Sequence, residues 1–207
     1  LIQNKALELS MFLSIPASVA LVIGSEQIIS ALFGYGSFTE NSVLNSSNAL
    51  YFFGLGLPAF AFIKVFSTFF FANHDTKTPF YISLVSVLLN ILISVYFFKD
   101  IGFIIIPIAT TISSWFNSLL LFIYLKNSNL FEFNKTFFRQ FFKIIFTSIM
   151  TGFFFKYLIL FFQNELSYDY FLKSVYLLLC VLLTIIFYFA LSYFIKAFNY
   201  QDIKLKY

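Results

Sequence analysis

Residues 48–71 read NALYFFGLGLPAFAFIKVFSTFFF, a run of 24 residues that carries one charge, Lys64. A helix of about 20 mostly apolar residues crosses the hydrocarbon core of a bilayer, so this run predicts a membrane span. An ammonium group at that depth costs about 2.5–3.5 kcal/mol and needs a partner, a hydrated cavity or a path to the interface. Lys64 is the only basic residue well inside an apolar stretch, and it is the first functional candidate.

The whole chain shares this apolar character. Of its 207 residues, 60% are hydrophobic and 11% are charged, which is too few charges for the surface of a soluble domain. The predicted fold class is an all-α polytopic membrane protein with six transmembrane helices. The six expected spans are Ala6–Gly24, Asn48–Phe71, Phe80–Phe98, Phe103–Leu125, Phe141–Phe162 and Phe171–Ile195.

The basic residues of the connecting segments predict the orientation, because cytoplasmic loops are enriched in Lys and Arg. Nine fall on one side: Lys5, Lys77, Lys126, Lys135, Arg139, Lys143, Lys196, Lys204 and Lys206. Three fall on the other side: Lys99, Lys156 and Lys173. The first side is therefore expected to be cytoplasmic, with both ends of the chain. This asymmetry accounts for the net charge of +4, so no nucleic-acid partner is expected.

Two prolines lie inside expected spans. Pro16 removes a backbone hydrogen bond from the first span and predicts a kink, either as a hinge or as a packing feature. Gly54 and Gly56 precede Pro58 in the second span, and this combination favours close helix contact and a local break.

Two loops have defined turn chemistry. On the outer side, Gly34 and Gly36 permit unusual backbone angles before Phe38, and Thr39 is suited to cap the next helix.

The inner turn contains Asp75, Thr76, Lys77, Thr78 and Pro79. Thr78 is expected to cap the third helix with Pro79 at its first position, and Asp75 is expected to fold back onto backbone donors.

Polar residues share one face on each of two neighbouring spans, since they recur every three or four residues. The third span has Ser83, Ser86, Asn90 and Ser94, and the fourth has Thr110, Thr111, Ser113, Ser114, Asn117 and Ser118. Such faces either bond to a neighbouring helix or line a hydrated cavity. Asn90 and Asn117 are the candidate cavity residues. By contrast, the last two spans are rich in phenylalanine, including Phe146, Phe153 and Phe187, and are expected to contact lipid.

Enzymatic chemistry is not indicated. The sequence has no nucleophile paired with a base, no paired carboxylates inside a span and no metal-ligand set, because His74 beside Asp75 lacks further ligands. We therefore expect no catalytic residues, no metal and no cofactor. Cys180 is expected to be a small buried residue. Transport, binding or scaffolding remain as functions.

Four motifs occur in a fixed order: LSIPAS at 13–18, FGYGSFT at 33–39, LPAFAFIKVF at 57–66 and FFANHDTKTP at 70–79. Together they resemble the lipid II flippase family, MurJ/MviN, within the multidrug/oligosaccharidyl-lipid/polysaccharide exporter superfamily. The resemblance covers residues 9–125 by motif and the last two spans by hydropathy and position. The family has fourteen spans, so the resemblance implies the last six, as a piece of a longer protein.

The resemblance implies alternating access that moves undecaprenyl-linked disaccharide-pentapeptide, a peptidoglycan precursor, from the inner to the outer leaflet of the bacterial inner membrane. Residues 1–125 would form a four-helix part of the C-terminal transport lobe. Residues 126–207 would form two further helices with a groove for the lipid tail, lined by Phe146, Phe153 and Phe187. Lys64 would face or gate the cavity, or reach the interface instead. The implied partners are lipid II, membrane lipids and the preceding spans. The alternatives are a related exporter of polysaccharide-linked lipid or drugs and a noncatalytic membrane scaffold.

Overall fold

The computed structural model describes residues 2–128 and 134–197. Within these ranges the regular elements are six α-helices and one short 3₁₀ turn. They are α1 (Ile2–Phe33), α2 (Glu40–Ala72), α3 (Lys77–Ile101), η1 (Gly102–Ile104), α4 (Ile105–Asn127), α5 (Lys135–Phe161) and α6 (Lys173–Ile195). Each apolar stretch predicted from the sequence corresponds to one of these α-helices, so the all-helical prediction is confirmed.

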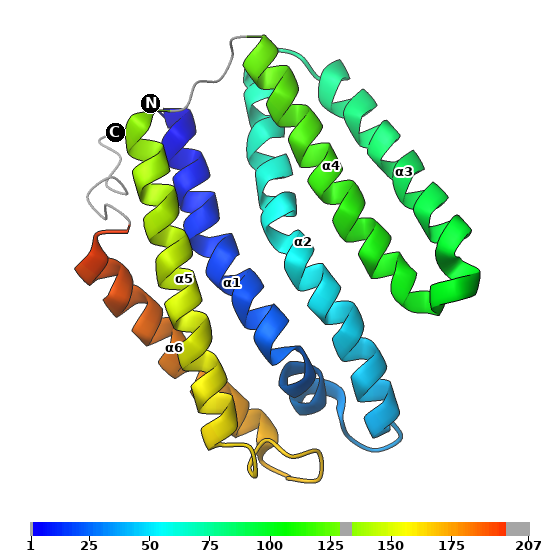
Figure 1. Ribbon diagram of the computed structural model, residues 1–207, viewed down its shortest axis with the longest axis vertical. Helices are drawn as coiled ribbons and strands as arrows, with labels where there is room; N and C mark the ends of the chain where they lie inside the picture. The colour runs from blue at the N-terminus through cyan, green and yellow to red at the C-terminus, as the bar shows by residue number, and fades with distance from the viewer. Residues whose placement is uncertain (1, 129–133, 198–207) are drawn as a thin grey trace.

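Five helical stretches of the described chain are long and apolar enough to cross a membrane. The number is five because α3, η1 and α4 form one unbroken helical run of 51 residues from Lys77 to Asn127. That run reverses direction near η1, where Gly102 adopts a left-handed φ of 75°, and α3 and α4 lie side by side (Figure 1). The structure thus confirms six α-helices, but it does not confirm six separate membrane spans.

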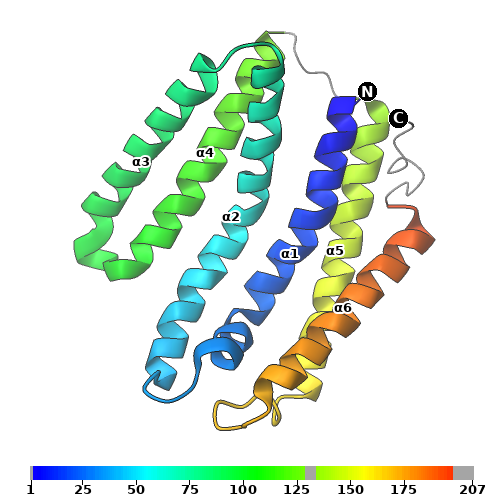
Figure 2. The same ribbon diagram turned by 180° about the vertical axis from the view of Figure 1, so that it is seen from behind.

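The helices form a row rather than a closed bundle. Figures 1 and 2 show the spatial order α3, α4, α2, α1, α5, α6, in which each helix packs against its neighbours and α6 also reaches α1. Both views show the last turns of α1 lying across one end of the row. Many large apolar side chains on α3, α5 and α6 are exposed as a result, which suits a chain surrounded by lipid or by further protein.

Small residues let the central helices approach closely. A Cβ atom on Gly54 of α2 would lie 3.0 Å from the Leu21 Cβ of α1. On the other side of α1, a Cβ atom on Gly152 of α5 would lie 2.5 Å from the Val19 Cγ1. Helix α1 is therefore held between α2 and α5 at distances that larger residues would not permit.

Both prolines predicted to break helices have their freed carbonyl groups satisfied by a different helix. Pro16 has no N–H for the carbonyl of Phe12, four residues earlier, and the Tyr188 hydroxyl of α6 donates to that carbonyl at 2.7 Å. Pro58 likewise frees the carbonyl of Gly54, which accepts a 2.7 Å bond from the Ser18 hydroxyl. Inside a membrane such replacement bonds are required, because no water is present to supply them.

Candidate functional site

Lys64 lies on a face of α2 that no helix of the described chain covers. Four other residues on this face are also exposed, at spacings of three, four or seven. They are Phe53, Phe60, Thr68 and Phe71. Helix α2 packs against α1 and α4 with its remaining surface. Exposure of the Lys64 side chain is compatible with a hydrated cavity and with a path to the interface.

Asn90 and Asn117 lie at the contact between α3 and α4. The Asn90 Nδ2 donates to the Thr110 hydroxyl at 3.1 Å and to the Ser113 hydroxyl at 3.3 Å. The Asn117 Nδ2 donates to the Ser83 hydroxyl at 3.4 Å. The two polar faces thus bond to each other, as the packing interpretation predicts.

Some polar capacity of this contact remains unused. Asn117 is 7% exposed, and its Oδ1 has no hydrogen-bond partner. The Ser94 hydroxyl on α3 is also buried without one. Unpaired buried polar atoms are costly, so these two atoms are available to a polar group that enters the contact. Among the described residues, no contact joins Asn90 or Asn117 to Lys64.

The fourth helix has a second polar edge that faces α2. The Thr111 hydroxyl donates to the Phe52 carbonyl at 2.6 Å, and the Trp115 Nε1 donates to the Leu55 carbonyl at 3.0 Å. Both acceptors are backbone carbonyls of α2 within the two turns before Pro58. Helix α4 therefore fixes α3 with one edge and α2 with the other.

The inner turn differs from its prediction in one respect. Helix α3 begins at Lys77, so Pro79 is its third residue and Thr78 is not the cap. The N-cap residue is Thr76, whose side chain forms no capping bond. Asp75 supplies those bonds instead, as predicted for a residue that folds back onto backbone donors: its Oδ1 accepts from the backbone N–H groups of Lys77 and Thr78 at 3.1 and 3.0 Å. Hydrogen bonds from the side chain and backbone of Thr78 hold the pKa of the Asp75 carboxyl below its usual value. The carboxylate of Asp75, three residues before Thr78, thus makes the capping bonds that were expected of the Thr78 hydroxyl, and the preceding residue, His74, adopts a left-handed φ of 59°.

The outer loop agrees with its prediction. Thr39 caps α2, and its hydroxyl accepts from the Ser42 N–H at 3.3 Å. Gly36 has a φ of 62°, which favours glycine. Gly34 is constrained sterically, since an added Cβ atom would lie 2.5 Å from the Ser30 carbonyl oxygen.

A buried lysine fastens this outer loop to α6. Lys173 is 1% exposed, and its ammonium donates to the carbonyls of Gly34, at 2.7 Å, and Tyr168. The same nitrogen lies 4.4 and 4.5 Å from the ring centres of Tyr35 and Tyr168. These carbonyls and rings offset the unfavourable position of a cation at the N-terminus of a helix.

Two further bonds continue the same junction. The Tyr168 hydroxyl donates to the Phe38 carbonyl at 2.6 Å, and the Ser174 hydroxyl donates to the Ala31 carbonyl at 2.6 Å. The sequence analysis counted Lys173 only as a loop charge. The available signal was a lysine that follows a tyrosine-rich loop. Its partner Gly34 lies 139 residues away along the chain, so the sequence could not pair the two.

An apolar cavity of about 480 Å³ lies between α1, α5 and α6. Phe12, Pro16, Thr151, Phe155 and Tyr188 are among its lining residues.

The three residues predicted for a lipid-tail groove do not line this cavity. Phe146 and Phe153 are 51% and 65% exposed, and their spacing places them on the opposite face of α5 from Thr151 and Phe155. Phe187 stacks on Phe154 at 4.3 Å between the ring centres.

The family model described as "Lipid II flippase MurJ" matches residues 1–180. Curated proteins named "Probable lipid II flippase MurJ" are similar to the chain as well. The protein from Rhizobium meliloti (strain 1021) is 39% identical over 121 residues, which is 58% of this chain and 23% of the relative. The protein from Rickettsia prowazekii (strain Madrid E) is 37% identical over 123 residues, or 59% of this chain and 24% of the relative.

A longer match is found with the protein of the same name from Buchnera aphidicola subsp. Schizaphis graminum (strain Sg), at 26% identity over 96% of this chain and 39% of the relative. Among solved structures, "Lipid II flippase MurJ, inward closed conformation" superimposes with a TM-score of 0.76 and 28% identity, over 97% of this chain and 39% of that chain. The chain thus spans less than two fifths of the length of these relatives. With a family model that matches most of its residues, the chain belongs to the MurJ lipid II flippase family.

Proposed function

We propose that this chain is the C-terminal portion of a lipid II flippase, which moves the undecaprenyl-linked peptidoglycan precursor from the inner to the outer leaflet by alternating access. The observation that carries the proposal is the family match over residues 1–180. The row of helices also supports it, because its uncovered faces leave room for a second lobe. Its partners would be lipid II, membrane lipids and the N-terminal spans of the same protein.

The proposal includes six membrane spans. Helices α3 and α4 have 25 and 23 residues, which correspond to about 35–38 Å at 1.5 Å per residue, so each is long enough to cross the bilayer alone. Six spans place both ends of this segment on one side. The excess of Lys and Arg there favours the cytoplasm, in the inner membrane of a bacterium.

Within this arrangement, residues 1–125 form the four-helix part of the transport lobe, and Lys64 is the cavity or gate residue. Its exposed ammonium on the uncovered face of α2 supports this role, since the pyrophosphate of the substrate needs a cation. Asn90 and Asn117 hold α3 and α4 together through their hydrogen bonds. The unpaired Oδ1 of Asn117 is the polar atom of this contact that a substrate or ion is able to use.

Residues 126–207 contribute the two helices that hold the lipid tail. The apolar cavity between α1, α5 and α6 suits a hydrocarbon chain, because polar lipid head groups would find few partners there. Phe146, Phe153 and Phe187 are proposed as the outer surface over which the tail approaches. The loops with Gly34, Gly36, Phe38 and Thr39, and with Asp75, Thr76, Lys77 and Pro79, hold the helix ends in place.

The test is genetic complementation. Residues 1–207 are joined to the eight N-terminal spans of a working lipid II flippase, and the host flippase is depleted. We expect the hybrid to restore growth, the Lys64→Met variant to fail, and the Lys156→Met variant to restore growth, because Lys156 is an exposed lysine on α5. Rescue by Lys64→Met would remove Lys64 from the mechanism. Failure of every hybrid despite normal insertion would contradict the flippase assignment.

A further inference from the structure

An apolar pocket of about 280 Å³ lies at the end of the row where α2 ends and α5 begins. Helices α1, α2, α4 and α5 all line it, although α4 and α5 do not pack against each other in the described chain. It shares no residue with the apolar cavity between α1, α5 and α6. Its lining residues on α2, Phe62 and Phe66, are each two positions from Lys64 and so lie on the opposite side of that helix. The flippase proposal assigns this pocket no role.

The lining of this pocket suits a hydrocarbon group. Aromatic rings from α2, α4 and α5 form most of it, and Ser118 is the one polar residue among those that line it. The Trp115 Nε1 already donates to the Leu55 carbonyl at 3.0 Å. The residues that α1 contributes are buried, whereas Leu119 on α4 and Phe138 on α5 are exposed. An apolar group can therefore enter between α4 and α5, but a polar group would find few partners there.

The dimensions of the pocket suit a single alkyl chain. Its volume lies below the range of about 300–1,000 Å³ that is usual for drug-sized ligands. Trp115 lines the pocket eleven residues before Lys126 on α4, which corresponds to about 16 Å at 1.5 Å per residue. One leaflet contributes about half of a hydrocarbon core of about 30 Å. A lipid whose head group lies at the level of Lys126 therefore has an acyl chain long enough to reach Trp115.

A cation lies where this chain would meet its head group. Lys126 follows Phe122 by four positions and Leu119 by seven, so it belongs to the face of α4 that lines the pocket. Its side chain is exposed in the last turn of α4, and within the described residues it forms no ion pair. An ammonium group forms charge-assisted hydrogen bonds with phosphate oxygens. The charge at this end of the pocket is thus complementary to an anionic head group.

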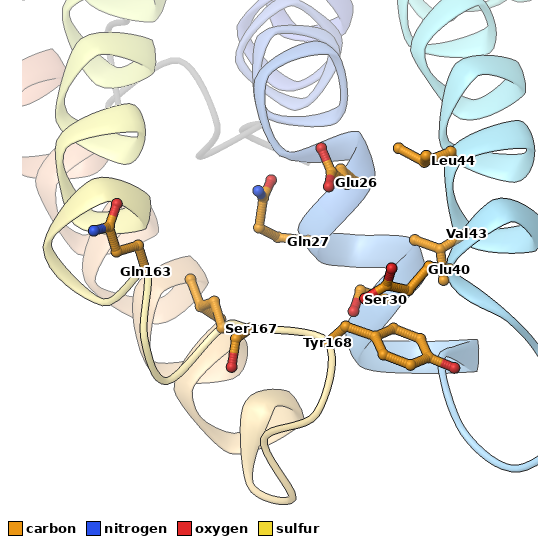
Figure 3. Close-up of a pocket in the computed structure, with 10 residues that line it drawn as sticks. Glu26, Gln27, Ser30, Glu40, Val43, Leu44, Gln163, Ser167 and Tyr168 are labelled. Atoms are coloured by element: carbon orange, nitrogen blue, oxygen red, sulfur yellow. The ribbon is translucent and has the colours of Figure 1, made fainter.

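The pocket at the opposite end of the row has a different character. It measures about 330 Å³ and lies between the end of α1, the start of α2 and the connection from α5 to α6 (Figure 3). Glu26 and Glu40 line it together with the amides of Gln27 and Gln163. Carboxylates repel an anionic head group, and a polar lining disfavours an alkyl chain. Of these two ends, only the one with Lys126 suits an anionic lipid.

We propose that the pocket between α4 and α5 binds one acyl chain of an anionic membrane phospholipid, whose phosphate group bonds to Lys126. The chain contacts the rings of Phe66 and Phe122 and ends near Trp115. It fills a space in which the lining side chains would otherwise lose packing contacts, since α4 and α5 do not meet. The proposal depends neither on flippase activity nor on which side of the membrane this end of the row faces.

Trp115 supplies the measurement, because it is the only tryptophan among the 207 residues. The chain is kept in an excess of dodecyl maltoside, and phosphatidylglycerol with bromine atoms near the end of one acyl chain is added to quench the tryptophan fluorescence. We expect quenching that saturates, and weaker quenching when the bromine atoms lie beside the carboxyl group. Phosphatidylcholine with the same brominated chain should bind about threefold to fivefold more weakly, since its head group has no net charge.

Two pairs of variants separate this pocket from the lipid that surrounds any membrane protein. Phe138→Ala removes part of the lining and should weaken binding about fivefold, whereas Phe142→Ala, one turn later and also exposed but outside the pocket, should not. Lys126→Met should abolish the preference for phosphatidylglycerol. Lys77→Met, which removes an exposed charge at the same end of the row, should retain that preference.

The proposal is overturned if quenching grows in proportion to the lipid fraction without saturating, or if Phe138→Ala and Phe142→Ala behave alike, because the lipid then only surrounds the protein. Equal affinity for the two head groups, or an unchanged preference in Lys126→Met, would also overturn it. The N-terminal spans are the other candidate occupant. In the hybrid described above, with phenylalanine in place of each tryptophan of the added spans, we expect the same saturable quenching. Its loss would show that those spans cover the pocket and would contradict the proposal.

Discussion

Replacing Lys173 with methionine tests the junction between the outer loop and α6. Methionine keeps an unbranched apolar side chain but removes the ammonium, which donates to two carbonyls and lies against two tyrosine rings. Each buried carbonyl left without a donor costs about 1–3 kcal/mol, and each lost cation–π contact costs about 0.5–2 kcal/mol. The change also relieves the several kcal/mol needed to bury an ammonium.

The lost carbonyl bonds and ring contacts outweigh this relief, so the lysine is favoured by about 2 kcal/mol. The two carbonyls find no other donor, because loop geometry that methionine does not alter holds them in place. That difference corresponds to about a thirtyfold increase in local opening. Hydrogen–deuterium exchange of residues 34–38 and 164–172 measures this directly, and we expect their protection to fall by that factor while the middle of α2 keeps its protection.

Lys156→Met is the matched control, since it removes the same charge from an exposed position on α5. It should change protection by less than about twofold. The reasoning is refuted if Lys173→Met leaves the outer loop as protected as before, or if Lys156→Met opens it equally.

Three further perturbations have defined outcomes. Tyr188→Phe leaves the Phe12 carbonyl unpaired and should lower the free energy of unfolding by about 1–3 kcal/mol, measured by denaturant titration in detergent. Gly152→Ala places a Cβ atom 2.5 Å from the Val19 Cγ1, so it should destabilise the contact of α1 with α5 by about 1–3 kcal/mol in the same assay. Asp75 has a lowered pKa in the folded chain, so its stabilising effect is complete above its unfolded value near about 4 and is lost as the pH falls through the lower folded value. The amides of Lys77 and Thr78, which donate to its carboxylate, should therefore lose protection from hydrogen exchange only below about pH 4.

The controls for these three use nearby positions. Tyr157→Phe, on an exposed side chain of α5, should leave stability within about 0.5 kcal/mol, and an equal loss there would contradict the role of the Tyr188 hydroxyl. Unchanged stability of Gly152→Ala would show that α1 and α5 adjust without cost. In Asp75→Ala the pH dependence at the inner turn should disappear, and its persistence would assign the titration to another group.

The sequence predicted what depends on local composition. Apolar runs located all six helices. The spacing of Asn90, Ser94, Thr110 and Ser113 indicated a polar face on each of two helices but left open whether these faces bond to a neighbouring helix or line a cavity. Thr39 was correctly identified as a cap, because a cap depends on residues within three positions. The inner turn was harder, because Asp75 and Thr78 both suit a cap and only the observed start of α3 at Lys77 shows that Asp75 makes the bonds.

Contacts between distant residues were not predictable. Pro16 and Pro58 indicated breaks, but nothing in the sequence specified that Tyr188 and Ser18 would supply the missing bonds. The burial of Lys173 depends on a loop 139 residues away. The order of helices in the row likewise follows from packing over the whole chain. In each case the relevant free energy depends on the position of helices relative to one another, which periodicity does not encode.

Direct translocation of lipid II tests the central claim. The hybrid of residues 1–207 with eight N-terminal flippase spans is reconstituted into vesicles with fluorescent lipid II, and a membrane-impermeant quencher reports which leaflet holds the lipid. A second hybrid, with the corresponding segment of the Rhizobium meliloti relative, controls for the junction. We expect both hybrids to move lipid II between leaflets and Lys64→Met to stop the first. If the control hybrid moves lipid II and the folded hybrid with this chain does not, the assignment as part of a lipid II flippase is contradicted.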